Sequence, residues 1–207
     1  MSYIRRVKLM EDQRIIKGQR MKIKIIETAI KILEKEGIEG ISAHKIADTL
    51  DVSKSNIFHH YKSINNIIEE VFETLMQFMI EPITVHGYER LEDFVMYLGQ
   101  SIYNLSPAER TIYVGTFQFY TFSLYNNKYQ HKFLEQKEKM IEVISNELYK
   151  LSGSEKKTCS MVSKMILMTL DGYGLSALIE QDNQSYEELW KVNTSYWCHM
   201  LNGVHYD

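Results

Sequence analysis

A short predicted helix at residues 54–61 begins with side chains that carry hydroxyl, amide and ammonium groups. Its first turn and the residue before it supply Ser53, Lys54, Ser55 and Asn56. Such groups at the positively polarised N-terminus of a helix are suited to hydrogen bonds with the phosphates and base edges of DNA. The predicted base contacts are Ser55, Asn56 and His59, with Asn56 able to pair with adenine through two hydrogen bonds. The predicted phosphate contacts are Ser42, Lys54, His60 and Lys62.

Two helices joined by a three-residue turn must position these groups. The first helix is predicted at 42–50 and the second at 54–61, and Asp51 and Ile57 follow Ala47 by four and ten residues. A small residue lets the helices approach, a turn residue tolerates the left-handed region, and a branched apolar residue packs the second helix onto the first. This spacing predicts a helix-turn-helix that binds DNA.

Residues 25–75 resemble the N-terminal domain of the TetR family of transcriptional regulators. The matching positions are Gly37, Ser42, Ile46, Ala47, Asp51, Val52, Ser53, Ile57, Phe58, His60, Tyr61 and Lys62. Asp51 stands where the family usually has glycine, and Asp tolerates the left-handed region better than most residues. Phe58 stands where tyrosine is common, which removes a hydroxyl that could reach a phosphate. The predicted DNA-binding set is completed by Ser53 and Phe58.

Composition predicts an all-α protein in a reducing compartment. The chain of 207 residues has two prolines and ten glycines, which argues against a turn-rich β protein. No apolar run reaches the length of a membrane span, and the N-terminus lacks the apolar core of a signal peptide. Cys159 and Cys198 fit a cytoplasmic protein without disulfides. We therefore expect a cytoplasmic protein with no membrane partner.

Charge is distributed unevenly along the chain. The net charge is -3, yet residues 1–24 hold 8 Lys or Arg against 2 Asp or Glu. A basic segment ahead of a helix-turn-helix suits the phosphate backbone, and arms of this kind can reach a minor groove. The alternative is a solvated tail that touches nothing, and the sequence leaves both open.

Hydrophobic periodicity and capping signals predict helices throughout the chain. They are expected near 16–37, 42–50, 54–61, 63–80, 89–105, 107–124, 127–151, 155–181 and 185–202. A break at Glu81–Gly87, which contains Pro82, predicts a boundary between two domains. We expect a DNA-binding head with a basic N-terminal arm at 1–80, and a helical ligand-binding and dimerisation body at 81–207.

Aromatic residues gather in the predicted helix 107–124. Tyr113, Phe117 and Tyr120 share one face of that helix at helical spacing, which suits either an ordinary core or the wall of a cavity. The family resemblance implies a small-molecule cavity in the body, and we predict that Met168 and Asp171 line it as well. Aromatic faces and one acid would favour a flat or cationic organic ligand.

The last two predicted helices carry more apolar surface than one core needs. Gly172, Leu175 and Ile179 lie on a second stripe of helix 155–181, and Trp190 and Trp197 lie on helix 185–202. We predict a homodimer in which these five residues form the interface, and the resemblance implies a four-helix bundle around a two-fold axis. The alternative is an internal core in a monomer.

Other chemistry is weakly represented. His59 and His60 are adjacent and point apart on a helix, and no nucleophile elbow, phosphate loop or metal-ligand spacing is present, so we expect no enzyme activity, cofactor, catalytic residue or metal site. The resemblance implies a ligand-responsive regulator, most often a repressor that a small molecule releases from a palindromic operator. The alternative is a coactivator of the same fold that binds proteins and has no operator of its own.

Overall fold

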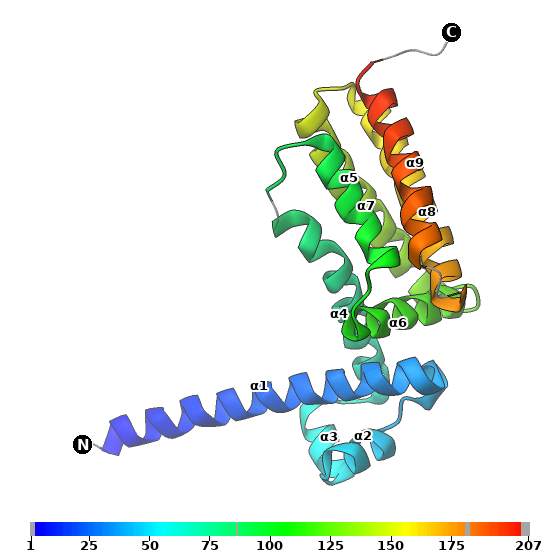
Figure 1. Ribbon diagram of the computed structural model, residues 1–207. Coiled ribbons are helices and arrows are strands. Elements are labelled where there is room, and N and C mark those ends of the chain that lie inside the picture. Colours follow the sequence, from blue (N-terminus) through cyan, green and yellow to red (C-terminus); the bar gives the residue numbers. More distant parts are fainter. Residues whose placement is uncertain (1–2, 86, 181–182, 204–207) are drawn as a thin grey trace. The chain divides into compact units, whose positions relative to one another are not determined.

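The computed structural model describes residues 3–85, 87–180 and 183–203, and the regular structure in these ranges is helical (Figure 1). The elements are α1 (Tyr3–Glu36), η1 (Ile38–Gly40), α2 (Ala43–Leu50), α3 (Lys54–His60), α4 (Ile64–Val85), α5 (Leu91–Tyr103), α6 (Pro107–Ser123), α7 (Asn127–Ser152), α8 (Lys156–Glu180) and α9 (Asn183–Leu201). The predicted all-α fold is therefore confirmed. The chain divides into two compact units, which we call the head (up to Leu75) and the body (from Met76).

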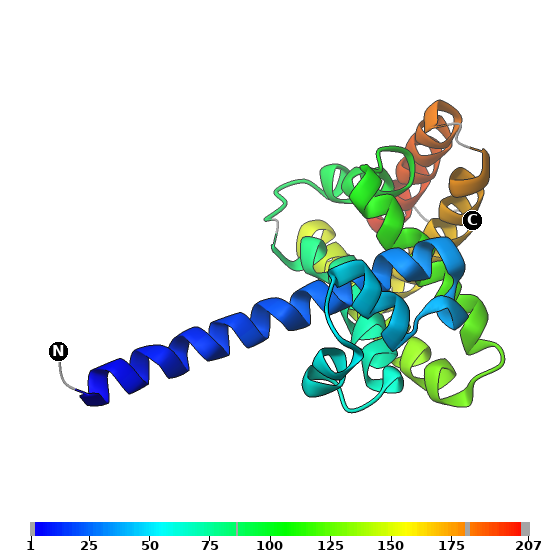
Figure 2. The same cartoon turned by 90° about the horizontal axis from the view of Figure 1, so that it is seen from below.

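The head is built on the C-terminal half of α1, against which α2 and α3 pack (Figures 1 and 2). Its core is formed by fully buried aliphatic side chains from four helices: Ile25 and Leu33 of α1, Ile46 of α2, Ile57 of α3, and Ile67 and Leu75 of α4. Helix α1 begins at Tyr3, well before the predicted start at residue 16. Both views show its N-terminal part extending beyond α2 and α3. The basic residues from Arg5 to Lys24 therefore belong to a helix.

Helix α4 joins the two units, and it does not break where the sequence predicts a hinge. It continues through Pro82 to Val85, past the predicted end at residue 80. A proline in a helix removes one backbone N–H donor. That loss, and the clash of the ring with the carbonyl four residues earlier, affect the turn before Pro82, so the residues from Pro82 to Val85 can still be helical.

In the body, α5, α7, α8 and α9 run side by side, and α6 crosses near one end of them (Figure 1). Helix α5 packs against α9 and α8, and α7 packs against α8. Ser106 starts α6 with a capping box, in which its hydroxyl accepts from the Glu109 N–H and the Glu109 carboxylate accepts from the Ser106 N–H at 2.8 Å.

Two tryptophans form the seam between α5 and α9. The Trp190 indole N–H donates to the Val95 carbonyl at 2.9 Å, and the Trp190 and Trp197 rings meet edge to face at 5.2 Å. Gly99 makes room for Trp190, because a Cβ at that position would lie 2.2 Å from the indole ring. Trp190 and Trp197 are 0% and 3% exposed, so neither has surface left to bury against a second chain. Their predicted place in a subunit interface is corrected: both belong to the internal core.

Candidate DNA-binding surface and ligand cavity

The turn between α2 and α3 has the predicted geometry. Asp51 caps α2 in the left-handed region (φ 53°, ψ 48°), and its N–H donates to the carbonyls of Ala47 and Asp48. The Val52 N–H donates to the Ala47 carbonyl at 3.0 Å. Ala47 is 2% exposed and Ile57 is fully buried. The small residue, the turn residue and the branched residue therefore hold α3 against α2 as the helix-turn-helix spacing requires.

Two serines that the sequence assigns to DNA contact also serve as helix caps. The Ser42 hydroxyl accepts from the Lys45 N–H at 3.3 Å, and the Ser53 hydroxyl accepts from the Asn56 N–H at 3.2 Å. Ser53 and Ser55 also share a hydrogen bond of 2.8 Å between their hydroxyl oxygens. Each cap satisfies a backbone donor at the start of its helix. These serines thus fix the starts of α2 and α3 whatever else they contact.

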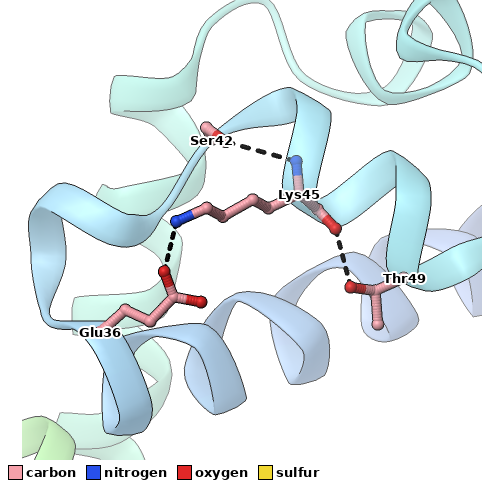
Figure 3. Close-up of polar contacts among 4 residues, drawn as sticks. All are labelled: Glu36, Ser42, Lys45 and Thr49. Atoms are coloured by element: carbon pink, nitrogen blue, oxygen red, sulfur yellow. Dashed lines mark hydrogen bonds and ion pairs between the residues drawn. The ribbon is translucent and has the colours of Figure 1, made fainter.

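Lys45 makes a structural contact that the sequence did not predict (Figure 3). Its ammonium forms an ion pair with the Glu36 carboxylate at the end of α1, and its carbonyl accepts from the Thr49 hydroxyl at 2.7 Å. Gly40 permits the tight turn between these helices, since a Cβ there would lie 2.6 Å from Glu36 Cβ. The pair joins residues nine apart in the sequence, with the short turn η1 between them, so the spacing within one α-helix does not predict it.

The remaining predicted DNA contacts lie on one short helix and just after it. Lys54, Ser55, Phe58, His59 and Lys62 are exposed, and Asn56 and His60 are half-buried. In the described part of the chain, the Asn56 amide oxygen is enclosed and has no hydrogen-bond partner. Neither Lys54 nor Lys62 has an ion-pair partner among the described residues. Two uncompensated ammonium groups therefore flank α3.

Burial and neighbouring positive groups affect the pKa of His60 at the end of α3. Burial, then His59, then Lys22 lower the pKa of His60. Lys22 of α1 stands 5.5 Å from the centre of the Tyr61 ring. A neutral His60 offers a hydrogen bond, not a charge, until an anion such as a phosphate restores its proton.

The body contains a cavity of about 330 Å³ between α4, α5, α6, α7 and α8. Its lining from α4 and α5 is Phe78, Met79, Pro82, Ile83, Tyr97, Leu98, Gln100 and Ser101, followed by Asn104. The lining from α6 is Glu109, Ile112, Tyr113, Thr116, Phe117 and Tyr120, and the lining from α7 and α8 is Phe133, Met140, Leu167, Leu170 and Asp171. The volume is at the small end of the range for ligand pockets.

Four of the five residues predicted for the cavity line it. Tyr113, Phe117 and Tyr120 of α6 face it together, and Asp171 of α8 lies among the other lining residues. Met168 does not: its side chain is 63% exposed, on another side of α8. The prediction also missed α4, because the expected hinge placed the end of that helix outside the body.

Burial raises the pKa of two polar groups of the lining. Burial raises the pKa of Tyr113 to about 12, against the opposing effect of the Ser101 hydroxyl. Burial also raises the pKa of Asp171, and it outweighs the lowering by Lys137, whose ammonium lies 3.5 Å from the Asp171 carboxylate. Asp171 is thus partly desolvated and has a cationic neighbour on α7.

An exposed apolar stripe follows α8 and α9. Its members are Met161, Met165, Met168, Leu175 and Ile179 of α8, and Leu189, Val192 and Tyr196 of α9. Gly172 falls within the α8 stripe, and a Cβ at Gly172 would meet no atom within 4 Å. Among the described helices, α8 is also long and apolar enough to cross a membrane, but only by length and composition. Its composition follows from having two apolar sides, one in the core and one on the surface.

A helix-turn-helix head followed by a helical body with a cavity is the architecture that the sequence resemblance predicts. Residues 25–71 match the family described as bacterial regulatory proteins, tetR family. The helix-turn-helix segment of this chain therefore matches the DNA-binding domain of that family, as the sequence resemblance predicts. The comparison with curated proteins found no match.

Solved structures share the fold along most of the chain. A transcriptional regulator from Rhodococcus sp. Rha1 has a TM-score of 0.75 and 14% identity, and the likeness covers 89% of this chain and 99% of that one. A regulator from Saccharomonospora viridis in complex with choline has a TM-score of 0.72 and 16% identity, covering 86% and 95%. The multidrug binding protein EbrR complexed with malachite green has a TM-score of 0.61 and 15% identity, covering 84% and 96%.

Proposed function

We propose that the protein is a repressor that binds a palindromic operator as a homodimer and leaves it when a small organic molecule enters the body. The observation that carries this proposal is the cavity of about 330 Å³, with aromatic and polar walls, in the same chain as a helix-turn-helix. Two proteins of the same fold hold choline and malachite green, which are both organic cations. Binding chromosomal DNA would place the protein in the cytoplasm, and the free thiols of Cys159 and Cys198 fit that compartment.

In this proposal α3 enters the major groove of the operator. Ser55, Asn56 and His59 contact bases, and the Asn56 side chain turns outward so that its amide oxygen, enclosed and unpaired in the free chain, accepts from adenine. Lys54 and Lys62 contact phosphates, which would give their uncompensated charges a partner. A coactivator that binds only proteins would have no need of two such cations beside α3.

The exposed stripe of α8 and α9 supplies the proposed dimer contact. Leu175 and Ile179 are 48% and 73% exposed, and Gly172 lets another helix approach closely. A specific interface buries more than about 1,200 Å² in total, and a stripe along two long helices can supply such an area. A two-fold dimer would present two α3 helices to a palindromic site.

Release follows if the ligand binds the DNA-free conformation more tightly than the DNA-bound one. By linkage, operator DNA then weakens ligand binding by the same factor. Several helices line the cavity, so filling it can bias how they pack against one another. A ligand with equal affinity for both conformations would release nothing.

Selection of genomic DNA fragments by the purified full-length protein tests this function. We expect enrichment of a near-palindromic sequence. Titrations followed by fluorescence anisotropy should then show that two protein chains bind each copy of this sequence. Addition of a compound that occupies the cavity should lower operator affinity. Enrichment of no sequence, or operator binding that no cavity occupant changes, would overturn the proposal.

A further inference from the structure

The charges of the cavity lining are of one sign. The lining contains two carboxylates, from Glu109 and Asp171, and no lysine, arginine or histidine among the described residues. Glu109 is exposed, and its carboxylate accepts the Ser106 N–H in the capping box of α6. Asp171 is therefore the carboxylate left to act on a molecule inside the cavity.

Lys137 of α7 is the cation that Asp171 contacts. Their atoms lie 3.5 Å apart, and the two side chains are 27% and 38% exposed. A tight ammonium–carboxylate hydrogen bond is about 2.7–2.9 Å long, so this contact is loose. Lys137 is not part of the lining, so it approaches Asp171 from outside the cavity wall. A contact this loose can be broken by another cation that approaches Asp171 from inside the cavity.

We propose that Asp171 makes the cavity selective for organic cations, and that Lys137 is a resident counter-ion which the bound cation replaces. This inference rests on the proposed ligand-responsive function and names its ligand class. The ligand's ammonium group takes the place of the Lys137 ammonium beside Asp171, and aromatic faces of Phe117, Tyr120 and Phe133 contact its substituents. Lys137 then moves toward solvent, which its long flexible side chain permits.

The same arrangement rejects anions. An anionic ligand would be repelled by the Asp171 carboxylate, which is partly desolvated. It could form an ion pair with the Lys137 ammonium only by drawing that ammonium away from Asp171. Breaking a partly buried ion pair leaves an uncompensated charge, which costs more than the pair contributes. A neutral molecule of the same shape would keep the pair intact and lose only the charge attraction.

Three small probes of similar size separate these cases. They are choline (cationic), 3,3-dimethylbutan-1-ol (its uncharged carbon isostere) and 3,3-dimethylbutanoate (anionic), and malachite green serves as a larger cation. Equilibrium dialysis with the full chain measures each affinity. We expect at least one cation to bind about tenfold or more tightly than the uncharged isostere, with the anion weakest.

Substitutions on both sides of the pair test the assignment of residues. Asp171→Asn should remove the preference for cations over the isostere. Lys137→Met should strengthen cation binding by about threefold or more, because no resident ammonium must be displaced, and cation binding should restore the thermal stability that Lys137→Met loses. Lys137→Arg should return binding toward wild type. Asp93→Asn and Lys139→Met change exposed charges on α5 and α7, away from the lining, and should change nothing.

The outcomes distinguish this inference from the function on which it rests. If neither cation binds better than the isostere, or if Asp171→Asn retains the preference with its helix content intact by circular dichroism, the selectivity is wrong. The repressor function survives that result if a neutral or anionic compound still releases operator DNA. If cations bind with the expected selectivity but operator affinity never changes, the inference stands and the repressor function fails.

Discussion

Lys62 and Asn56 lie a few residues apart beside the same turn, yet we expect them to affect DNA binding differently. Replacing Lys62 with Ala should weaken binding to all sequences about equally and reduce the slope of log affinity against log salt by about 1, because one phosphate contact is lost. Asn56→Ala should cost about 1–3 kcal/mol on the preferred operator and relax specificity at one base pair. Anisotropy titrations at several salt concentrations measure both effects.

Lys150→Ala is the control, since Lys150 is exposed at the end of α7 and paired with Glu147 at 3.2 Å. It should leave affinity and salt dependence unchanged. If Asn56→Ala and Lys62→Ala both bind the operator as tightly as the wild type does, α3 is not part of the DNA interface.

Phe117 and Phe119 provide a matched pair on α6, because Phe117 lines the cavity and Phe119 is fully buried beside Tyr129. Phe119→Ala should lower the free energy of unfolding by about 3–5 kcal/mol, as for a well-packed core ring. Phe117→Ala should cost clearly less, since part of its ring faces empty space, but it should weaken ligand-induced release of DNA. Denaturant unfolding and operator titration with ligand measure the two effects. Equal losses of stability for both variants would show that Phe117 is ordinary core.

Residue spacing predicted contacts within one helix better than contacts between helices. The positions 113, 117 and 120 follow from helical geometry, and all three residues do line one cavity. Met168 and the two tryptophans were misplaced because periodicity gives the relative direction of side chains but not which direction is inward. The ion pair between Lys45 and Glu36 depends on a turn through Gly40, which no periodic pattern describes.

The predicted helix boundaries lie within two residues of the observed ones, except for the start of α1 and the end of α4. Ser42, Ser53 and Ser106 stand immediately before α2, α3 and α6, and each accepts a backbone N–H. Pro82 suggested the end of α4, but a proline disturbs only the turn before it, so the helix continues to Val85. A cap acts through its own side chain, whereas the effect of a breaker depends on what packs around it.

The approach of α5 to α9 depends on Gly99. Gly99→Ala should lower the free energy of unfolding by about 1–3 kcal/mol, because its Cβ would overlap the Trp190 ring. That ring cannot move away without losing its hydrogen bond to the Val95 carbonyl. Thermal and denaturant unfolding of the full chain measure the loss.

Gly174→Ala is the matched control, since Gly174 is also buried in a helix of the body. A Cβ at Gly174 would meet the Phe117 ring at 3.7 Å, an ordinary contact, so stability should stay level or rise by up to about 1 kcal/mol. Equal effects of the two substitutions would mean that the α5–α9 seam tolerates a wider spacing.

At the scale of the whole molecule, the two apolar sides of α8 set the proposed assembly. Buried Val162 and Ile166 pack into the body, while the exposed stripe through Leu175 and Ile179 has no partner among the described residues of one chain. The excess of apolar surface could be predicted from sequence, but which residues remain exposed could not. That choice depends on α5, whose Gly99 admits Trp190 and so turns the tryptophan side of α9 inward.

Leu175→Arg and Ile179→Arg should therefore split the dimer without unfolding the chain. Each substitution places a charge on a surface that would be buried between two copies, where an unpaired charge costs several kcal/mol. Sedimentation velocity at micromolar concentration should show a dimer for the wild type and a monomer for each variant, with unchanged circular dichroism.

Tyr125→Arg is the control: Tyr125 is 91% exposed, but it follows α6 and lies outside the stripe, so that variant should remain dimeric. The monomeric variants should also bind a palindromic operator more weakly than the wild type does, yet bind an isolated half-site about as well, because each head is intact. If the wild type is a monomer, the exposed stripe needs another explanation. The proposed recognition of a palindromic operator by two symmetric heads would then be wrong.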